Sequence, residues 1–137
     1  MIVVDTSLAL QWVLDEPDAD RAELLLSGQS LAAPDIVFVE AANVLGKKIR
    51  KEQIELVQGI AGLDFIRDRL QQIVPGASLV ERGLELSVEL NHPVYDCIFL
   101  ACAQQLGAAL ATRDAPFAAR VRQSPYAAVL HDNGGAP

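Results

Sequence analysis

Five acidic residues lie at points of the sequence where, taken together, they could do chemistry. Asp5, Asp35 and Asp114 each follow a short apolar run that predicts a buried strand. Glu40 and Asp96 lie near the start of apolar helical segments. Carboxylates that gather at one edge of a sheet repel one another and are costly to desolvate, and a hard divalent cation such as Mg²⁺ or Mn²⁺ offsets both costs. We therefore expect a metal site built from carboxylate oxygens.

Each of these acids also has a purely structural interpretation. An Asp before a helix commonly caps it, and a Glu in the first turn interacts favourably with the helix dipole. Taken one at a time, capping accounts for Asp5, Asp35, Asp96 and Asp114. Taken together, the acids converge where the sequence supplies few basic partners, with Arg113 the only obvious one. The joint pattern therefore favours the metal site.

Short apolar strands alternate with helices along the chain, which predicts an α/β fold with a parallel sheet covered on both faces. Strands are expected at 2–4, 31–33, 72–74, 109–111 and 128–130. Helices are expected at 8–14, 18–26, 36–51, 53–69, 78–90, 95–106 and 115–123. Ligands of such sheets bind outside the carboxyl ends of the strands, which is where the sequence places these acids.

The composition excludes several classes of protein. The 137 residues fit one domain, and 18 acids against 11 Lys and Arg give a net charge of −7, which argues against a basic protein that holds phosphates by bulk attraction. The longest apolar run, 97–103, is too short to span a membrane, and no signal peptide is visible. Cys97 and Cys102 are expected to be reduced core residues of a cytoplasmic protein.

Four short motifs resemble, in order, the motifs of PIN-domain nucleases. They are Ile-Val-Val-Asp-Thr-Ser at 2–7, Pro-Asp-Ile-Val at 34–37 with Glu-Ala-Ala-Asn at 40–43, Val-Tyr-Asp-Cys at 94–97, and Leu-Ala-Thr-Arg-Asp at 110–114. The size and motif order resemble the VapC toxins of bacterial VapBC toxin–antitoxin pairs. The resemblance implies a three-layer α/β/α PIN-like domain with a central, mostly parallel sheet at residues 1–131, followed by a flexible C-terminal tail at 132–137.

The resemblance also implies which acids form the site. The catalytic and metal-binding positions carry over as Asp5, Glu40, Asp96 and Asp114. In such proteins Asp5 and Asp96 would be the leading direct ligands, and Glu40 and Asp114 would complete the cluster directly or through water. The implied ion is Mg²⁺, for which Mn²⁺ would substitute. Asp35 is instead expected to cap the helix that carries Glu40.

Polar residues beside these motifs are expected to support the ligands or to meet the substrate. Thr6, Asn43 and Thr112 match the polar companions of the motifs and are expected to hold the carboxylates in place. The implied reaction is magnesium-dependent hydrolysis of RNA phosphodiester bonds by an endoribonuclease toxin. Contacts to RNA are expected from Arg113, Lys47 and Lys48.

The resemblance implies two protein partners. One is a cognate VapB-type antitoxin, whose C-terminal segment would cover the active-site groove and place a basic side chain at the acids. The other is a second copy of the chain, in a homodimer. Binding of RNA is expected to depend on divalent metal and local bases, since the chain has no basic field.

Rival functions predict different observations. A PIN-domain nuclease that acts outside any toxin–antitoxin pair would share the whole site. A non-catalytic protein-binding module, in which the acids only cap helices, would show no response to divalent ions. A haloacid-dehalogenase-type phosphatase needs a second Asp where Ser7 stands, and a receiver domain needs paired acids before the first Asp, which are absent.

Overall fold

A computed structural model describes residues 1–14 and 26–131 of the chain. The tail predicted at 132–137, and all but the last residue of the helix predicted at 18–26, lie outside the described residues.

Four parallel strands form the central sheet, in the order β3-β2-β1-β4. They are β1 (Ile2–Val4), β2 (Leu31–Pro34), β3 (Gln72–Val74) and β4 (Ala109–Ala111). The central strand β1 is fully buried, with Val3 aligned with Ala32 on one neighbour and Leu110 on the other. Its β-branched residues suit a strand that is covered on both faces. The strands predicted at 2–4, 31–33, 72–74 and 109–111 are confirmed.

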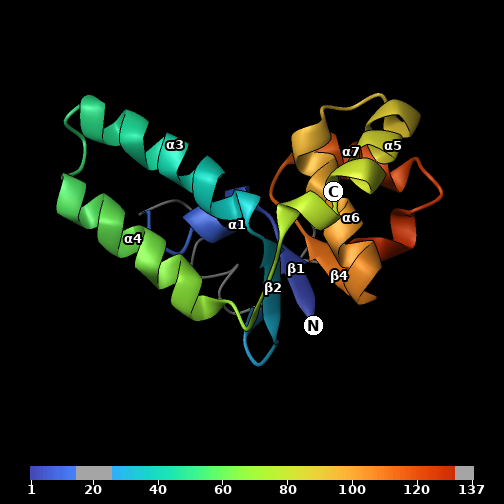
Figure 1. Ribbon diagram of the computed structural model, residues 1–137, viewed down its shortest axis with the longest axis horizontal. Coiled ribbons are helices and arrows are strands. Elements are labelled where there is room, and N and C mark those ends of the chain that lie inside the picture. Colours follow the sequence, from blue (N-terminus) through green and yellow to red (C-terminus); the bar gives the residue numbers. More distant parts are fainter. Residues whose placement is uncertain (15–25, 132–137) are drawn as a thin grey trace.

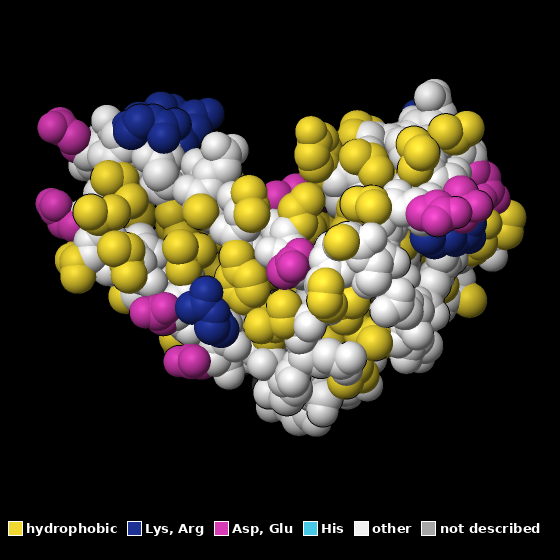
Figure 2. Space-filling model, in the orientation of Figure 1, with side chains coloured by type: hydrophobic (Ala, Val, Ile, Leu, Met, Phe, Trp, Pro, Cys, Tyr) yellow, Lys and Arg dark blue, Asp and Glu magenta, His cyan; other side chains and the backbone are white. Residues whose placement is uncertain are grey.

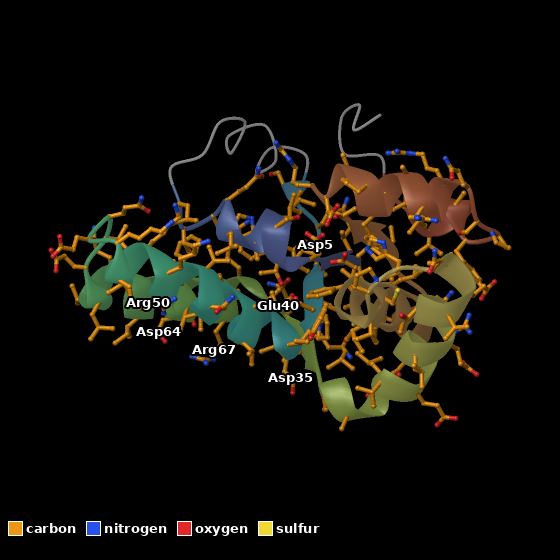
Figure 3. All side chains as sticks on the ribbon, turned by 90° about the horizontal axis from the view of Figure 1, so that it is seen from above. Asp5, Asp35, Glu40, Arg50, Asp64 and Arg67 are labelled. Carbon is orange, nitrogen blue, oxygen red and sulfur yellow. The ribbon has the colours of Figure 1, made fainter. Side chains whose placement is uncertain are left out.

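Helices lie on both sides of this sheet (Figures 1 and 3). On one side are α1 (Thr6–Leu10), α3 (Ile36–Arg50) and α4 (Leu56–Arg69), and on the other are α5 (Val80–Leu90), α6 (Val94–Leu106) and α7 (Ala115–Arg122). Two short 3₁₀ helices, η1 (Gly76–Ser78) and η2 (Ala127–Val129), precede α5 and follow α7. The three-layer α/β/α architecture with a parallel sheet is therefore confirmed.

Helix α6 is the centre of the core. Every residue from Cys97 to Ala103 is buried, because the helix packs against β1, β2 and β4 on one side and against α5 on the other. Gly107 ends it with a φ of 61°, a left-handed conformation that glycine adopts without strain. Both cysteines are buried and unpaired, and burial raises the pKa of Cys97 to about 11, so the thiols are uncharged core groups.

Helices α3 and α4 form a long hairpin, the α3–α4 arm, on one side of the molecule (Figure 1). Helix α3 buries Val37, Ala41 and Leu45 along one face, as its apolar spacing predicts, and packs against α1 and α4. Helix α4 begins with a capping box between Glu55 and Gln58. None of the helices in the described ranges is long and apolar enough to cross a membrane.

Two predicted elements differ from the structure. The strand predicted at 128–130 is wrong, because local bonds from Val129 N to Tyr126 O (2.9 Å) and from Leu130 N to Ala127 O (3.2 Å) close a 3₁₀ turn. Only an isolated bridge to Leu110 remains of the expected pairing. The helix predicted at 8–14 instead begins at Thr6, two residues earlier, because Asp5 caps it, and it ends at Leu10.

The packing of α5 gives a test of the core. Leu86 is fully buried against the rest of the core, whereas Leu84 on the same helix is 61% exposed. We expect Leu86→Ala to lower the free energy of unfolding by about 2–5 kcal/mol, through lost burial and the cavity left behind. At a protein concentration too low for chains to associate, Leu84→Ala is expected to change it by less than about 0.5 kcal/mol. Urea denaturation of the two variants measures both values, and equal losses would contradict this packing.

Candidate active site

Four of the five acids singled out in the sequence line one cavity. Asp5 directly follows β1, Asp114 follows β4, Glu40 lies in the second turn of α3 and Asp96 in the first turn of α6. All four line a cavity with a volume of about 630 Å³. The cavity lies where the space-filling view shows the molecule hollowed between the α3–α4 arm and the α5–α7 block (Figure 2), and Figure 3 shows Asp5 and Glu40 beside each other there.

Asp5 is the most buried of these acids, with 4% of its surface exposed. Its Oδ1 accepts hydrogen bonds from the Leu8 N–H (3.0 Å), which caps α1, and from the Ser7 hydroxyl (2.7 Å). Its Oδ2 accepts from the Thr112 hydroxyl, which follows β4. Burial raises the pKa of Asp5 to about 6; the three donors lower it, and the charge of Asp96 adds a smaller upward contribution.

Glu40 faces the same cavity from α3. The Thr6 hydroxyl donates to its Oε1 at 2.5 Å, which ties the start of α1 to α3. Burial raises the pKa of Glu40, against the bond from Thr6, and the charge of Asp96 raises it further. The charge of Asp96 thus raises the pKa of both Asp5 and Glu40, because the carboxylates interact electrostatically across the cavity.

Asp114 and Asp96 are each held through one oxygen. Asp114 caps α7, because its Oδ1 accepts from the Phe117 N–H at 3.0 Å, and its own N–H donates to the Thr112 hydroxyl oxygen at 3.0 Å. Thr112 therefore bridges Asp5 and Asp114. Asp96 Oδ2 lies 2.6 Å from Nε2 of His92, so its second oxygen is left for the cavity.

The remaining oxygens are suited to a hard divalent cation. Within the described residues, Oε2 of Glu40, Oδ1 of Asp96 and Oδ2 of Asp114 have no hydrogen-bond donor. In the same part of the chain, no three His, Cys, Asp or Glu side chains already enclose a position for an ion. This donor set fits Mg²⁺, which is usually held by one or two carboxylates and keeps several waters, better than an ion that needs an all-protein cage.

The polar companions predicted from the sequence take different positions. Thr6 and Thr112 hold carboxylates through their hydroxyls, as expected. Asn43 lines the cavity and makes no hydrogen bond there with a described residue. Lys47, Lys48 and Arg113 lie outside the cavity lining, and the backbone N–H of Arg113 donates to the Ser7 hydroxyl at 3.1 Å.

Asp35 does not cap α3 with its side chain, so that prediction is wrong. The residue adopts a helical conformation, and its side chain makes no hydrogen bond to the helix. Its Oδ1 instead accepts from the Gly76 N–H at 2.9 Å, at the start of η1. The carboxylate is thereby turned away from the cavity, which it does not line.

Sequence reasoning missed two residues that contact the acids. They are Ser7, whose hydroxyl donates to Asp5, and His92, whose ring contacts Asp96. The signal for Ser7 was the position two residues after an N-cap, where a hydroxyl can return to the cap. The signal for His92 was its i, i+4 spacing to Asp96 across a helix start.

The cavity also has an apolar part. Val39 on α3 and Tyr95 on α6 line it and are 69% and 59% exposed. Ile36, Val44 and Phe99 lie around the same wall. A ligand that fills the cavity therefore meets carboxylates and exposed apolar surface together.

Comparison with known proteins agrees with the fold and the motifs. A family model of the PIN domain matches residues 2–122. A VapC ribonuclease of Mycobacterium bovis is 31% identical over 114 residues, which cover 83% of this chain and 86% of that protein.

Solved structures share the fold at lower identity. PAE2754 from Pyrobaculum aerophilum has a TM-score of 0.68 at 22% identity, covering 87% of this chain and 78% of that one. VapBC2 from Rickettsia felis, solved bound to a DNA fragment from its promoter, has a TM-score of 0.65 at 24% identity, covering 92% and 95%. The motif order, the fold and the relatives agree that the chain belongs to the PIN-domain family and, within it, to the VapC ribonucleases.

Proposed function

We propose that this protein is a magnesium-dependent endoribonuclease toxin that acts in the cytoplasm and is neutralised by a cognate VapB-type antitoxin. The observation that carries the proposal is the group of four carboxylates, Asp5, Glu40, Asp96 and Asp114, lining one cavity at the carboxyl ends of the parallel strands. Membership of the VapC ribonucleases supports RNA as the substrate.

Hydrogen bonds within the chain hold and orient the four acids. Asp5 and Asp96 are the proposed leading ligands, and Glu40 and Asp114 complete the set directly or through water. When bound, Mg²⁺, or Mn²⁺ in its place, lowers the pKa of water and neutralises the negative charge that develops at phosphorus during hydrolysis. Asp5 and Glu40, whose pKa values burial raises, give up their protons more readily once a cation lies beside them.

The basic end of α3 supports a path for the RNA strand. Figure 2 shows Lys and Arg side chains gathered at the outer end of the α3–α4 arm, where Lys47, Lys48 and Arg50 form the last turn of α3. Lys47 and Lys51 follow Glu40 by about two and three helical turns, or about 10 and 16 Å at 1.5 Å per residue, on the same face. Neither has an ion-pair partner among the described residues.

Lys48, the residue after Lys47, lies on a different face of α3. Lys48 is rotated by about 100° from Lys47 around the helix and is half-buried. We therefore propose that Lys47 and Lys51 contact phosphates of a strand whose scissile bond lies at the acids, with Arg113 contacting it near Asp114. This leaves Lys48, predicted as an RNA contact, as a matched comparison on the same helix.

The same cavity supports binding of the antitoxin. Four acids in one cavity attract a basic side chain, and the exposed Val39 and Tyr95 beside them offer apolar contacts. A C-terminal segment of the antitoxin that combines a basic residue with apolar neighbours would therefore block the site where RNA must enter.

A homodimer is also part of the proposal. Figure 2 shows hydrophobic side chains gathered over both arms of the molecule. Six exposed apolar residues lie on two helices, three on α4 and three on α5, each more than half exposed: Leu56, Val57, Ile60, Val80, Leu84 and Val88. Exposed apolar faces of this kind are typical of surfaces that pair with another protein.

Removal of a single ligand carboxylate tests the nuclease. We expect Asp96→Asn and Asp5→Asn each to lower Mg²⁺-dependent RNA cleavage by more than about 100-fold, beyond what the loss of a residue that only supports a metal ligand produces. Asp35→Asn is the control, because Asp35 lies at the same sheet edge but outside the cavity, and it should cleave like the wild type. Wild-type cleavage by either cavity variant, measured on labelled RNA with and without EDTA, would contradict the assignment.

Divalent ions distinguish the nuclease from a module whose acids only cap helices. Mn²⁺ is expected to raise the melting temperature of the wild-type protein, because an ion that binds only the folded state stabilises it by RT ln(1 + [L]/Kd). The rise should be much smaller for Asp96→Asn. An unchanged melting temperature for the wild type at millimolar Mn²⁺ would favour the capping module.

The raised pKa of Asp5 predicts how stability depends on pH in EDTA. The folded state keeps a proton on Asp5 up to about pH 6, whereas the unfolded chain releases it near 3.8. Stability is therefore lost as the pH rises from about 4 to about 6, by about 3 kcal/mol for this group. Asp5→Asn does not titrate and still accepts the Leu8 N–H, so its advantage should appear at pH 7.5 and vanish at pH 4. Urea denaturation at both pH values checks this, and a pH-independent difference would count against it.

Salt dependence tests the path along α3. In an Asp96→Asn background, where cleavage is expected to be lost and the residual binding is compared at one fixed Mg²⁺ concentration, Lys47→Ala/Lys51→Ala should weaken RNA binding and reduce the slope of log K against log salt by about 1.4, for two single-strand phosphate contacts. Lys48→Ala should leave the slope almost unchanged. Equal effects from Lys48→Ala would show that only general charge, and no defined path, is involved.

A further inference from the structure

His92 occupies a fixed position in the turn between α5 and α6. Asn91 ends α5 in a left-handed conformation, with a φ of 50°, and Pro93 precedes α6. The His92 N–H donates to the Ser87 carbonyl oxygen at 3.1 Å, and the Ser87 hydroxyl donates to the His92 carbonyl oxygen at 2.6 Å. Two hydrogen bonds, one donated and one accepted, therefore link the backbone of His92 to Ser87 on α5.

The ring of His92 is held as firmly as its backbone. Its centroid lies 4.9 Å from that of Phe117 on α7, with the two planes tilted by 35°, and Phe117 is fully buried. Only 12% of the His92 side chain is exposed. Contacts with α5 and α7 thus leave the ring little freedom to turn.

The ring of His92 contacts one of the proposed metal ligands, Asp96. Nε2 of His92 lies 2.6 Å from Oδ2 of Asp96, one turn further along the chain. The tautomer of His92 that has its proton on Nε2 donates a hydrogen bond to this carboxylate oxygen. The bond takes up one oxygen of Asp96, whose side chain is 28% exposed, and leaves Oδ1 without a donor among the described residues.

Asp96 has no other such support in the described part of the chain. Asp5 and Asp114 are fixed by the backbone N–H groups of the helices that they cap, and Glu40 is fixed by Thr6. Asp96 lies within the first turn of α6, whose N-cap is Pro93, and its side chain caps nothing. Among the described residues, the contact with His92 is the only hydrogen bond that orients its side chain.

We propose that His92 is a positioning residue, which through its Nε2–H holds Asp96 in the one orientation that presents Oδ1 to the metal. The proposal rests on the function proposed above, because it assigns the supporting residue of a ligand in that site. Hydrogen bonds to the far oxygen of a ligating carboxylate fix its direction, and losing such a partner typically weakens metal binding by 10–100-fold.

Three variants separate the hydrogen bond from the packing of the ring. His92→Phe keeps an aromatic ring against Phe117 and loses the donor. His92→Gln loses the ring and offers an amide N–H at a similar reach. His92→Ala loses both. If His92 only fills space between α5 and α7, His92→Phe should behave like the wild type and His92→Gln like His92→Ala.

The first readout is the affinity of the full-length protein for Mn²⁺, measured by calorimetry without RNA. We expect His92→Phe and His92→Ala to bind about 10–100-fold more weakly than the wild type, with binding largely restored in His92→Gln. Wild-type affinity in His92→Phe would overturn the proposal. Melting curves in EDTA report whether each variant is folded.

The second readout needs no metal and therefore separates the two proposals. In EDTA, three-bond NMR couplings should show a single side-chain conformer for Asp96 in the wild type and in His92→Gln, and averaging in His92→Phe. A single conformer in His92→Phe would overturn the positioning role even if the protein is a nuclease. A wild-type protein that binds no Mn²⁺ would overturn the metal site, and with it the proposed ligand role of Asp96.

Discussion

The burial of the Asp5 carboxylate at the end of the central strand is the interaction on which the site depends. Because β1 lies between β2 and β4, the residue after it is largely shielded from water, with 4% of its surface exposed, and it contacts Thr112 in the segment that follows β4. Three hydrogen bonds favour its charged form, yet burial outweighs them and raises its pKa. The fold thus holds a carboxylate in a place where its charge is costly, and three others line the same cavity. The cation that we propose there would offset that cost.

Capping a helix is compatible with the proposed metal binding by the same side chain. Asp114 caps α7 through Oδ1, so the backbone fixes the carboxylate while its Oδ2 stays available, whereas Asp5 caps α1 through Oδ1 and accepts from Thr112 through Oδ2. Asp35 shows the contrast, since its carboxylate is tied to Gly76 and takes no part in the cavity. What distinguishes a capping acid from a ligand here is which way the second oxygen faces.

Much of this arrangement could be read from the sequence because it depends on local patterns. Buried parallel strands are continuous apolar runs, and the residues after them must share an edge, which located Asp5 and Asp114. Contacts fixed by packing between distant elements could not be read in this way. Three features depend on how helices approach one another. They are the hydrogen bond between Asp35 and η1, the contact of the His92 ring with α7, and the 3₁₀ turn in place of a last strand.

The Thr112 bridge has a consequence for when the site comes into existence. Its hydroxyl joins Asp5 to the segment after β4, across 107 positions of the chain, and Asp114 follows two residues later. During synthesis, Asp5, Glu40 and Asp96 all enter the chain before β4 can pair with β1. The carboxylates then lack both their final member and the hydroxyl that links the first to the last. The four-acid site is therefore completed only when almost the whole domain has been made.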